Sequence, residues 1–365
     1  FELIKDKEIK ATIKSVLGTF VKSGRPNQAS AFFLKAINSL SENAVFGCVL
    51  PSSIFTLDIY NSLRNHISEI SNFKIIGKLG NYVFEDALTD VSIIVGIKNR
   101  INFPPKLIWT KNEKGVAQEA LRELRKLQAN NEIAISKNSY SIYTPERFPI
   151  LENNWRIISL NENKFITDLN VYIGARKLIK LQEIFTVYQG ALLGTKDVFT
   201  ISEDEYLGYS DEERIYFRPL LNNSAINKGC INITEYVWYP YNQNGLMIQN
   251  EVELNQITFA QKKLLPNKLK LQQRSENREE WWSLTRPRNW QFIKEKRLYS
   301  TRFGNSNSFG YDNIGDAVII EGNAFFPKKE MSEEDLLFYL AVFSSNYFDY
   351  LLSIFSKQLA GGKWY

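Results

Sequence analysis

The sequence predicts an α/β domain followed by an α+β domain, and three observations lead to this prediction. In the first hundred residues, apolar segments of strand length alternate with segments whose apolar residues have helical spacing. From about residue 151 onward the pattern becomes irregular, with short strands, many Asn and Tyr residues and isolated glycines. A chain of 365 residues with 44% hydrophobic residues is large enough to form two cores.

The first domain is expected to span residues 1–105 and to contain the last three strands of an open sheet. Nearly continuous apolar or β-branched runs are typical of strands that are covered on both faces. The expected elements are, in order, a helix through Phe33, Ala36, Ile37 and Leu40, a strand at 44–50, a helix through Leu63, Ile67 and Ile70, and strands at 73–79 and 91–97.

Residues 106–150 are expected to form a connecting region, because Pro104 and Pro105 precede it and a charged helix occupies its middle. This helix, near Ala117–Ala129, should expose its basic residues, namely Arg122, Arg125 and Lys126. The second domain is expected to span residues 151–365. Near its end Ser332 and three acidic residues indicate a helix start, and an apolar helical stretch continues through Ile354.

The composition excludes several classes of protein. With a single histidine, His66, zinc sites and Ser/His/Asp triads are unlikely sources of chemistry here. Cys48 and Cys230 lie far apart, which argues against a disulfide framework and fits a reducing, cytoplasmic location. No apolar run approaches the ~20 residues of a membrane helix. Because the net charge is only +5, any affinity for polyanions must come from local clusters of Lys and Arg.

Four linked features of the first domain carry a family resemblance. They are the strand end VLPSSIF (49–55), the helix IYNSLRNHI (59–67), the strand that ends at Leu79 and Gly80, and the stretch VFEDALTDVSIIV (83–95). Together they resemble the second half of the γ-class adenine-N6 DNA methyltransferases, the TaqI-like enzymes that include those fused in type IIG restriction enzymes. The resemblance implies a Rossmann-like sheet and transfer of a methyl group from S-adenosylmethionine to a flipped adenine.

The same resemblance assigns a role to Phe84. In this family the turn before the final strand forms a wall of the pocket for the extruded adenine, and an aromatic residue there stacks on the base. Stacking on a ring offsets part of the base stacking that is lost when the base leaves the duplex. The alternative is that Phe84 anchors its loop in the core. Asp86 and Asp90 lie in the same turn and are assigned no chemistry.

Two further motifs of the family are absent from this sequence. One is the Asn/Asp-Pro-Pro-aromatic tetrapeptide that accepts hydrogen bonds from the target amino group, and the other is the glycine-containing turn for S-adenosylmethionine. We therefore expect the chain to be a fragment that does not methylate alone, with both motifs upstream. Phe1 is the one catalytic candidate, as the aromatic residue that closes the tetrapeptide.

The second domain resembles the DNA target-recognition domains that follow this methyltransferase half. The resemblance extends over EIFTVYQGALLGTKDVF (183–199), RPLLNNSAIN (218–227), YVWYPYN (236–242) and QLAGGKWY (358–365). In the last segment the resemblance implies that Gly361 and Gly362 let the backbone approach DNA and that Lys363 contacts phosphate. The alternative is that the glycine pair simply ends a helix.

The segment WWSLTRPRNW (281–290) is the strongest candidate for DNA contact. Arg286 and Arg288 flank a proline in a non-helical stretch beside Trp282, and arginine binds both phosphates and guanine. Upstream basic residues should bind the DNA backbone in a salt-dependent manner. These are Lys262, Lys263, Lys268, Lys270, Arg274 and Arg278. The alternative for this run is a solvated helix face.

The sequence thus favours a site-specific DNA adenine methyltransferase of a restriction-modification system, with double-stranded DNA as partner and a restriction nuclease fused to it or separate. A non-catalytic DNA specificity subunit is the main alternative. An Asn-Pro-Pro or Asp-Pro-Pro sequence just before Phe1 would favour the enzyme. A methyltransferase that acts on RNA or protein is a more distant alternative.

Overall fold

The computed structural model describes residues 6–21, 27–84, 89–101, 103–130, 134–151, 154–227, 229–274 and 280–356. The chain divides into two compact units, Phe1–Ala175 and Arg176–Tyr365, and each is considered by itself. Among the described helices, none combines the length and the apolar composition that crossing a membrane requires.

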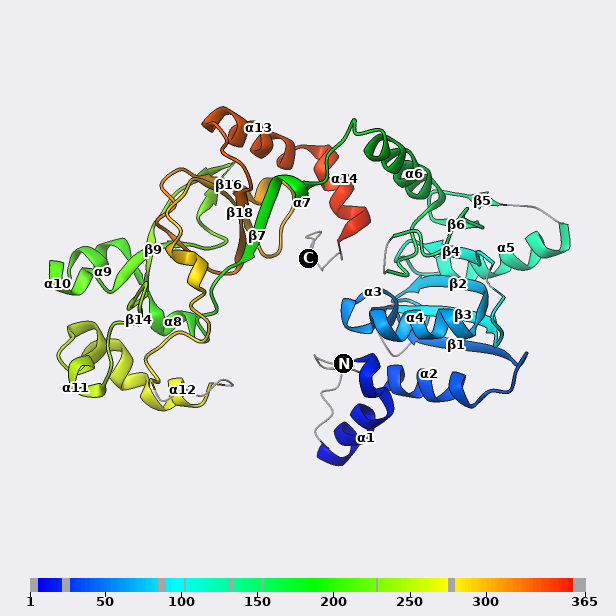
Figure 1. Cartoon of the computed structure of the whole chain (residues 1–365), viewed down its shortest axis with the longest axis horizontal. Helices are drawn as coiled ribbons and strands as arrows, with labels where there is room; N and C mark the ends of the chain where they lie inside the picture. The colour runs from blue at the N-terminus through cyan, green and yellow to red at the C-terminus, as the bar shows by residue number, and fades with distance from the viewer. Residues whose placement is uncertain are drawn as a thin grey trace. The chain divides into compact units, whose positions relative to one another are not determined.

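The first unit is built on a six-stranded mixed sheet in the order β1-β3-β2-β4-β6-β5, drawn in blue through cyan to green in Figure 1. Its elements are α1 (Lys7–Leu17), η1 (Gly18–Phe20), α2 (Gln28–Ser39), β1 (Val45–Pro51), α3 (Ser53–Thr56), η2 (Asp58–Tyr60), α4 (Asn61–Ile70), β2 (Asn72–Gly80), β3 (Val91–Ile97), β4 (Lys106–Thr110), α5 (Val116–Asn130), β5 (Ile135–Ser136), β6 (Tyr140–Tyr143) and α6 (Leu160–Gly174).

The three strands expected in the first hundred residues are confirmed as β1, β2 and β3. Strand β3 lies between the other two and is antiparallel to both, so that Ile97 is paired with Val45 on one side and with Asn72 on the other. The helices α2 and α4, which precede β1 and β2, also follow the predicted spacing. In α2 the buried apolar residues are Ala31, Phe33, Leu34 and Ile37, and in α4 they are Leu63 and Ile67.

The segment 106–143 is part of the sheet, which corrects the expectation that 106–150 only connects two domains. Strand β4 pairs in parallel with β2, and β6 pairs with β4. The charged helix exists as α5 and exposes its basic residues to solvent. Its apolar side, which includes Ala120 and Leu124, packs on Ile108 and Ile142 of the sheet. Two consecutive prolines gave this segment the appearance of a linker, although a short buried strand follows them directly.

The first unit also extends beyond residue 150, to Ala175. Trp155 is buried, and its ring contacts Phe55 and Phe73 at centroid distances of 5.6 and 5.0 Å. The backbone N–H of Trp155 donates to the carbonyl of Phe55 at 2.9 Å. Helix α6 then begins with a capping box between Ser159 and Glu162. The boundary expected near residue 150 is therefore about 25 residues too early, because this segment packs on the first sheet.

Strand β1 is the edge of the sheet and exposes an apolar row. Val45 and Val49 are 70% and 55% exposed, and they lie opposite Ile97 and Ile93 on the same face of the sheet. Within the described ranges, β1 pairs with β3 alone. An apolar edge strand of this kind is a surface to which another strand can add.

We therefore expect this chain to self-associate through β1 and expect Val49→Lys to weaken that association at least about tenfold, corresponding to about 1.4 kcal/mol. Sedimentation velocity over a concentration series measures the effect. Val252→Lys is the matched control, because Val252 is 72% exposed but lies on α11 in the second unit. Equal behaviour of the two variants would exclude β1 as the associating edge.

The second unit consists of small, mostly antiparallel sheets joined by short helices and long loops, and β17 pairs in parallel with β9. Its two larger sheets have the orders β17-β9-β12-β8 and β16-β15-β18-β7. Its elements are α7 (Leu181–Ile184), β7 (Phe185–Gln189), α8 (Lys196–Phe199), β8 (Thr200–Ser202), α9 (Glu203–Leu207), α10 (Asp211–Arg214), β9 (Phe217–Leu221), β10 (Ile226–Asn227), β11 (Cys230–Ile231), β12 (Glu235–Trp238), β13 (Tyr241–Asn242), β14 (Gly245–Leu246), α11 (Glu251–Leu254), η3 (Ala260–Leu264), η4 (Leu265–Asn267), α12 (Lys268–Gln272), η5 (Asn289–Phe292), β15 (Arg297–Thr301), η6 (Ser306–Ser308), β16 (Phe309–Asp312), β17 (Val318–Ile319), β18 (Gly322–Pro327), α13 (Glu333–Phe343) and α14 (Asn346–Phe355).

The predicted C-terminal helical stretch is two helices. Ser332 caps α13 through a capping box with Asp335, as its position before the acidic residues indicated. The helix ends at Ser344, and the side chain of Ser345 accepts from the N–H of Phe348 to start α14. Buried residues of α13, including Phe343, pack on the sheet that contains β7 and β15.

Candidate nucleic-acid interface

Trp282 is part of the core, which corrects its assignment as a DNA-facing residue. Its side chain is 3% exposed, and its indole N–H donates to the carbonyl of Ile248 at 3.3 Å. The neighbouring Trp281 is buried as well. The segment 281–285 is therefore an anchor in the largest core cluster of the second unit, and the chain reaches the surface only at Arg286.

Arg274 is also committed inside the protein, which corrects its assignment as a contact to the DNA backbone. Its guanidinium donates to four backbone carbonyls, those of Leu271, Leu193, Ser283 and Trp281, at 2.6 to 3.2 Å. The group also lies over the ring of Phe199. Arg274 thus binds the start of the 281–290 segment to the turn after β7.

The turn after β7 requires glycine at position 194. Gly194 has φ +87°, a conformation that L side chains rarely adopt, and a Cβ there would collide with Thr285 Oγ1. This close approach lets residue 192 pair with the arginine segment. The N–H groups of Leu192 and Arg286 donate to each other's carbonyls at 3.0 and 2.9 Å. The predicted strand-and-turn motif therefore supports the backbone of Arg286.

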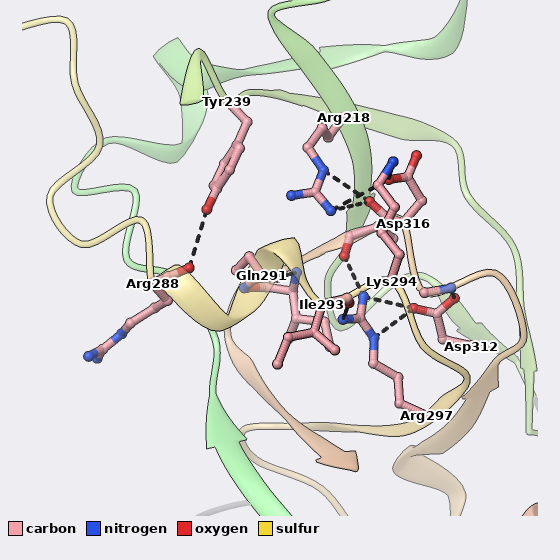
Figure 2. A network of polar contacts seen from close by, with 12 residues as sticks. Arg218, Tyr239, Arg288, Gln291, Ile293, Lys294, Arg297, Asp312 and Asp316 are labelled. Carbon is pink, nitrogen blue, oxygen red and sulfur yellow. Dashed lines mark hydrogen bonds and ion pairs between the residues drawn. The ribbon is translucent and has the colours of Figure 1, made fainter. Parts of the chain in front are cut away.

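Arg286 and Arg288 occupy a non-helical surface segment, as the sequence predicted. The side chain of Arg286 is exposed and that of Arg288 is half-buried. Arg288 has φ +69°, which is uncommon for a residue other than glycine and persists where the surrounding structure enforces it. Its Nη2 donates to Gln189 Oε1 at 3.3 Å. Figure 2 shows the Arg288 side chain pointing away from the polar network beneath it.

A buried ion pair lies at the centre of that network (Figure 2). Arg297 is fully buried and its guanidinium contacts the carboxylate of Asp312 at 2.9 Å. Burial lowers the pKa of Arg297, and the charge of Asp312 counteracts this effect. Arg297 Nη2 also donates to the carbonyl of Ala317 at 2.6 Å, and the N–H of Gly315 donates to Asp312 at 2.8 Å. Both charges are therefore compensated by hydrogen bonds as well as by each other.

Arg218 and Tyr239 connect this centre to the arginine segment. Arg218 donates to the carbonyl of Asp316 at 2.6 and 3.0 Å, and its guanidinium lies 5.1 Å from the centre of the Tyr239 ring. The hydroxyl of Tyr239 donates to the carbonyl of Pro287 at 2.9 Å. Burial raises the pKa of Tyr239, so this hydroxyl remains a donor over the whole neutral range. Pro287, which lies between the two arginines, is thus held by a hydrogen bond from the core.

Gln291 and Trp290 hold the other end of the segment. The side chain of buried Gln291 donates to the carbonyl of Ile319 at 2.8 Å and accepts from its N–H at 3.2 Å. The indole N–H of Trp290 donates to the carbonyl of Gln189 at 3.0 Å, and its ring stacks with Tyr188. The segment from Arg286 to Gln291 is therefore fixed at both ends, as pre-organised recognition of a ligand requires.

Three of the six basic residues upstream are paired with acidic residues, and Arg278 lies outside the described residues. Lys270 is half-exposed and forms an ion pair with Asp197 at 2.6 Å, while Lys263 and Lys268 pair with Glu205 and Glu251. Exposed pairs of this kind reduce the positive field that a phosphate backbone would meet. The positive charge of these three lysines is therefore partly offset, and Lys270 is the most exposed of the three.

In the first unit, Phe84 is 49% exposed, so it does not seal the core. Stacking on a base stays a prediction, and so does the alternative that Phe84 anchors its loop. Phe1, Asp86, Gly361, Gly362 and Lys363 lie outside the described residues.

A polar hollow beside the arginine segment was not predicted from the sequence. It has a volume of about 620 Å³ and lies between the two-residue turn of β13 and β14 and residues of the 280–292 segment. The lining residues are Tyr241, Asn242, Gln243, Asn244, Gly245, Leu246, Gln249, Glu280, Ser283, Pro287, Asn289 and Phe292. The Asn-Gln-Asn-Gly sequence indicates a hairpin turn, but it contains no sign of what lies opposite.

No protein-family model and no curated protein matches the sequence. Among solved structures, the type IIL restriction-modification enzyme MmeI in complex with DNA matches with a TM-score of 0.57 and 11% sequence identity. The chain is similar in fold to part of MmeI. The match covers 89% of this chain and 39% of the MmeI chain, so this chain spans about two fifths of the length of that enzyme.

Two other solved structures align over most of the chain with lower scores. The type IIG restriction endonuclease BpuSI covers 94% of this chain with 15% identity and a TM-score of 0.36, and 42% of its own chain is matched. DrdV in complex with DNA covers 95% with 12% identity and a TM-score of 0.40, and 36% of its chain is matched. Scores this low do not by themselves establish a common fold.

Proposed function

We propose that this chain is part of a restriction-modification enzyme that methylates the N6 amino group of adenine in DNA, and that its second unit selects the DNA sequence. The observation that carries the proposal is the arginine segment, which presents Arg286 and Arg288 on a rigidly held backbone. The similarity in fold to MmeI, which was solved with DNA, supports it. Arginine on a fixed backbone suits both phosphate binding and bidentate pairing with guanine.

In this proposal the first unit forms part of the methyltransferase domain. Phe84 is accessible for stacking on an extruded adenine, and the apolar edge of β1 offers a site at which a larger sheet would continue. The methyl donor would be S-adenosylmethionine, and we assign no residue of this chain to its binding. A restriction nuclease, fused or separate, would be the natural partner.

A gel-shift titration of the chain on duplex DNA over a salt series tests the proposal. We expect the affinity for DNA to fall as the salt concentration rises, because Lys and Arg side chains that bind phosphates release the counterions of DNA into solution. Arg286→Ala combined with Arg288→Ala should lower the affinity at least about tenfold at moderate salt. Duplex RNA and single-stranded DNA in the same assay test the alternative polynucleotide substrates.

The matched control removes two exposed arginines of the first unit, Arg122→Ala with Arg125→Ala on α5. It produces the same change in net charge at a surface to which we assign no DNA contact. If both double variants bind like the wild type, the arginine segment is not the interface. If the wild type does not bind duplex DNA at any salt concentration, the second unit does not act as a DNA reader in this chain.

A further inference from the structure

We propose that the polar hollow beside the arginine segment reads the major-groove edge of an adenine, with the side-chain amides of Gln243, Asn244 and Asn289 as its recognition groups. This inference rests on the proposed DNA binding of the second unit and adds to it the base that is recognised. Adenine presents an amino donor and a ring-nitrogen acceptor side by side, and an amide side chain carries one acceptor and one donor that match them.

The turn that carries two of these amides is well fixed. Strands β13 and β14 pair across it, and Gly245 adopts φ +117°. Asn242 closes the turn, because its Oδ1 accepts from the N–H of Asn244 at 2.8 Å. In the described part of the chain, the side-chain amides of Gln243 and Asn244 make no hydrogen bond. Both residues are exposed at the tip and line the hollow, so their hydrogen-bonding capacity remains available to a ligand.

The opposite wall supplies the third amide and an unsatisfied hydroxyl. Asn289 follows Arg288 directly, is exposed and lines the hollow. Ser283 also lines it, is 2% exposed, and its Oγ has no hydrogen-bond partner among the described residues. A buried hydroxyl without a partner is costly, and a polar group that enters the hollow could satisfy it.

Glu280 indicates which part of DNA would enter. Glu280 lines the same hollow, and a carboxylate there repels the phosphates of the DNA backbone. It accepts hydrogen bonds from exocyclic amino groups of bases, so it favours a base edge at this place. Five residues with amide side chains line the hollow against one with a carboxylate, and three of these amides make no hydrogen bond in the described part of the chain. The donor-and-acceptor pattern of adenine therefore fits better than the single amino donor of cytosine.

The hollow and the arginine segment form one rigid body. The hydroxyl of Tyr241, at the start of the turn, accepts from the N–H of Leu284 at 2.6 Å. The indole of Trp282 binds the carbonyl of Ile248, just after β14, at 3.3 Å. The amides and the arginines are therefore held in a constant relation, as reading of adjacent base pairs requires.

Selection from a pool of randomised DNA duplexes, followed by sequencing of the bound fraction, tests the inference. The wild-type chain should enrich a site that contains an adenine at a defined position. Gln243→Ala should reduce the preference for that adenine about tenfold. It should keep the affinity for non-specific DNA and the salt dependence of the wild type, because the amide carries no charge. Gln256→Ala is the matched control, since Gln256 is exposed in the same unit and does not line the hollow.

The outcomes separate the two proposals. If the wild type enriches a site and Gln243→Ala, Asn244→Ala and Asn289→Ala all leave the preference unchanged, the hollow does not read bases while the proposed DNA binding stands. If these variants change the preference only at positions without adenine, the assignment of adenine is wrong. If the wild type binds no duplex, the proposed function fails and the inference fails with it.

Discussion

Arg297→Ala should destabilise the second unit by about 3–5 kcal/mol, because it leaves the charge of Asp312 buried without its partner. Arg297 is fully buried and also binds the carbonyls of Ala317 and Ile293. Its guanidinium lies over the rings of Trp290 and Phe326 at 5.7 and 5.5 Å. The variant therefore loses packing as well as an ion pair. Hydrogen exchange of the amides of β9 and β15 measures the local free energy of opening.

The exposed ion pair between Lys270 and Asp197 provides the control for this prediction. Both side chains are more than half exposed, so Lys270→Ala should leave hydrogen exchange in the same strands nearly unchanged. Replacing both buried partners, Arg297→Met with Asp312→Leu, should restore part of the stability, because no unpaired charge then remains. A loss for Arg297→Ala no larger than that for Lys270→Ala would show that the buried pair does not stabilise the unit.

Arg297→Ala should also weaken DNA binding, although Arg297 itself is buried and is not proposed to contact DNA. Arg297 donates to the carbonyl of Ala317, and the preceding carbonyl, that of Asp316, accepts from Arg218. Arg218 in turn lies against Tyr239, whose hydroxyl donates to the carbonyl of Pro287. The network in Figure 2 thus connects a buried charge to the backbone between Arg286 and Arg288. Without this support we expect the arginine segment to become flexible. It would then lose conformational entropy when it binds DNA, which lowers the affinity.

The architecture of the first unit was largely predictable from its sequence. Buried strands such as β3 and amphipathic helices such as α4 have clear sequence patterns, because apolar residues occupy every position on a covered face. The prediction that residues 106–150 form a connecting region was wrong for a physical reason. A strand of five residues after Pro104 and Pro105 carries little local signal, and its place beside β2 is determined by distant residues.

The second unit was less predictable because tertiary contacts decide the role of each residue. The sequence located the arginine segment but could not distinguish the buried Trp282 from an exposed aromatic residue. It also could not place Arg274 against the carbonyl of Leu193, which is 81 positions away. The amide hairpin was missed since a polar turn looks the same whether it faces solvent or a recognition hollow.

Trp238→Ala should produce a second large loss, about 3–5 kcal/mol of the stability of the second unit, because it opens a cavity in its main core. Trp238 is fully buried in β12, and its ring lies 4.9 Å from that of Phe259 and 5.6 Å from that of Phe217. Its indole N–H donates to the carbonyl of Trp282 at 3.1 Å. The same side chain therefore packs the core and anchors the start of the arginine segment.

Trp238→Phe separates these two roles. A phenylalanine keeps much of the packing but leaves the carbonyl of Trp282 without its donor, which should cost about 1–3 kcal/mol. We expect hydrogen exchange in β9 and β12 to accelerate strongly in Trp238→Ala and only moderately in Trp238→Phe. DNA affinity should fall in both, since both release Trp282 four residues before Arg286. Wild-type DNA affinity in Trp238→Phe would mean that the other contacts, among them the Arg297 network, are sufficient to position the arginine segment, and that the hydrogen bond from Trp238 contributes stability without contributing to recognition.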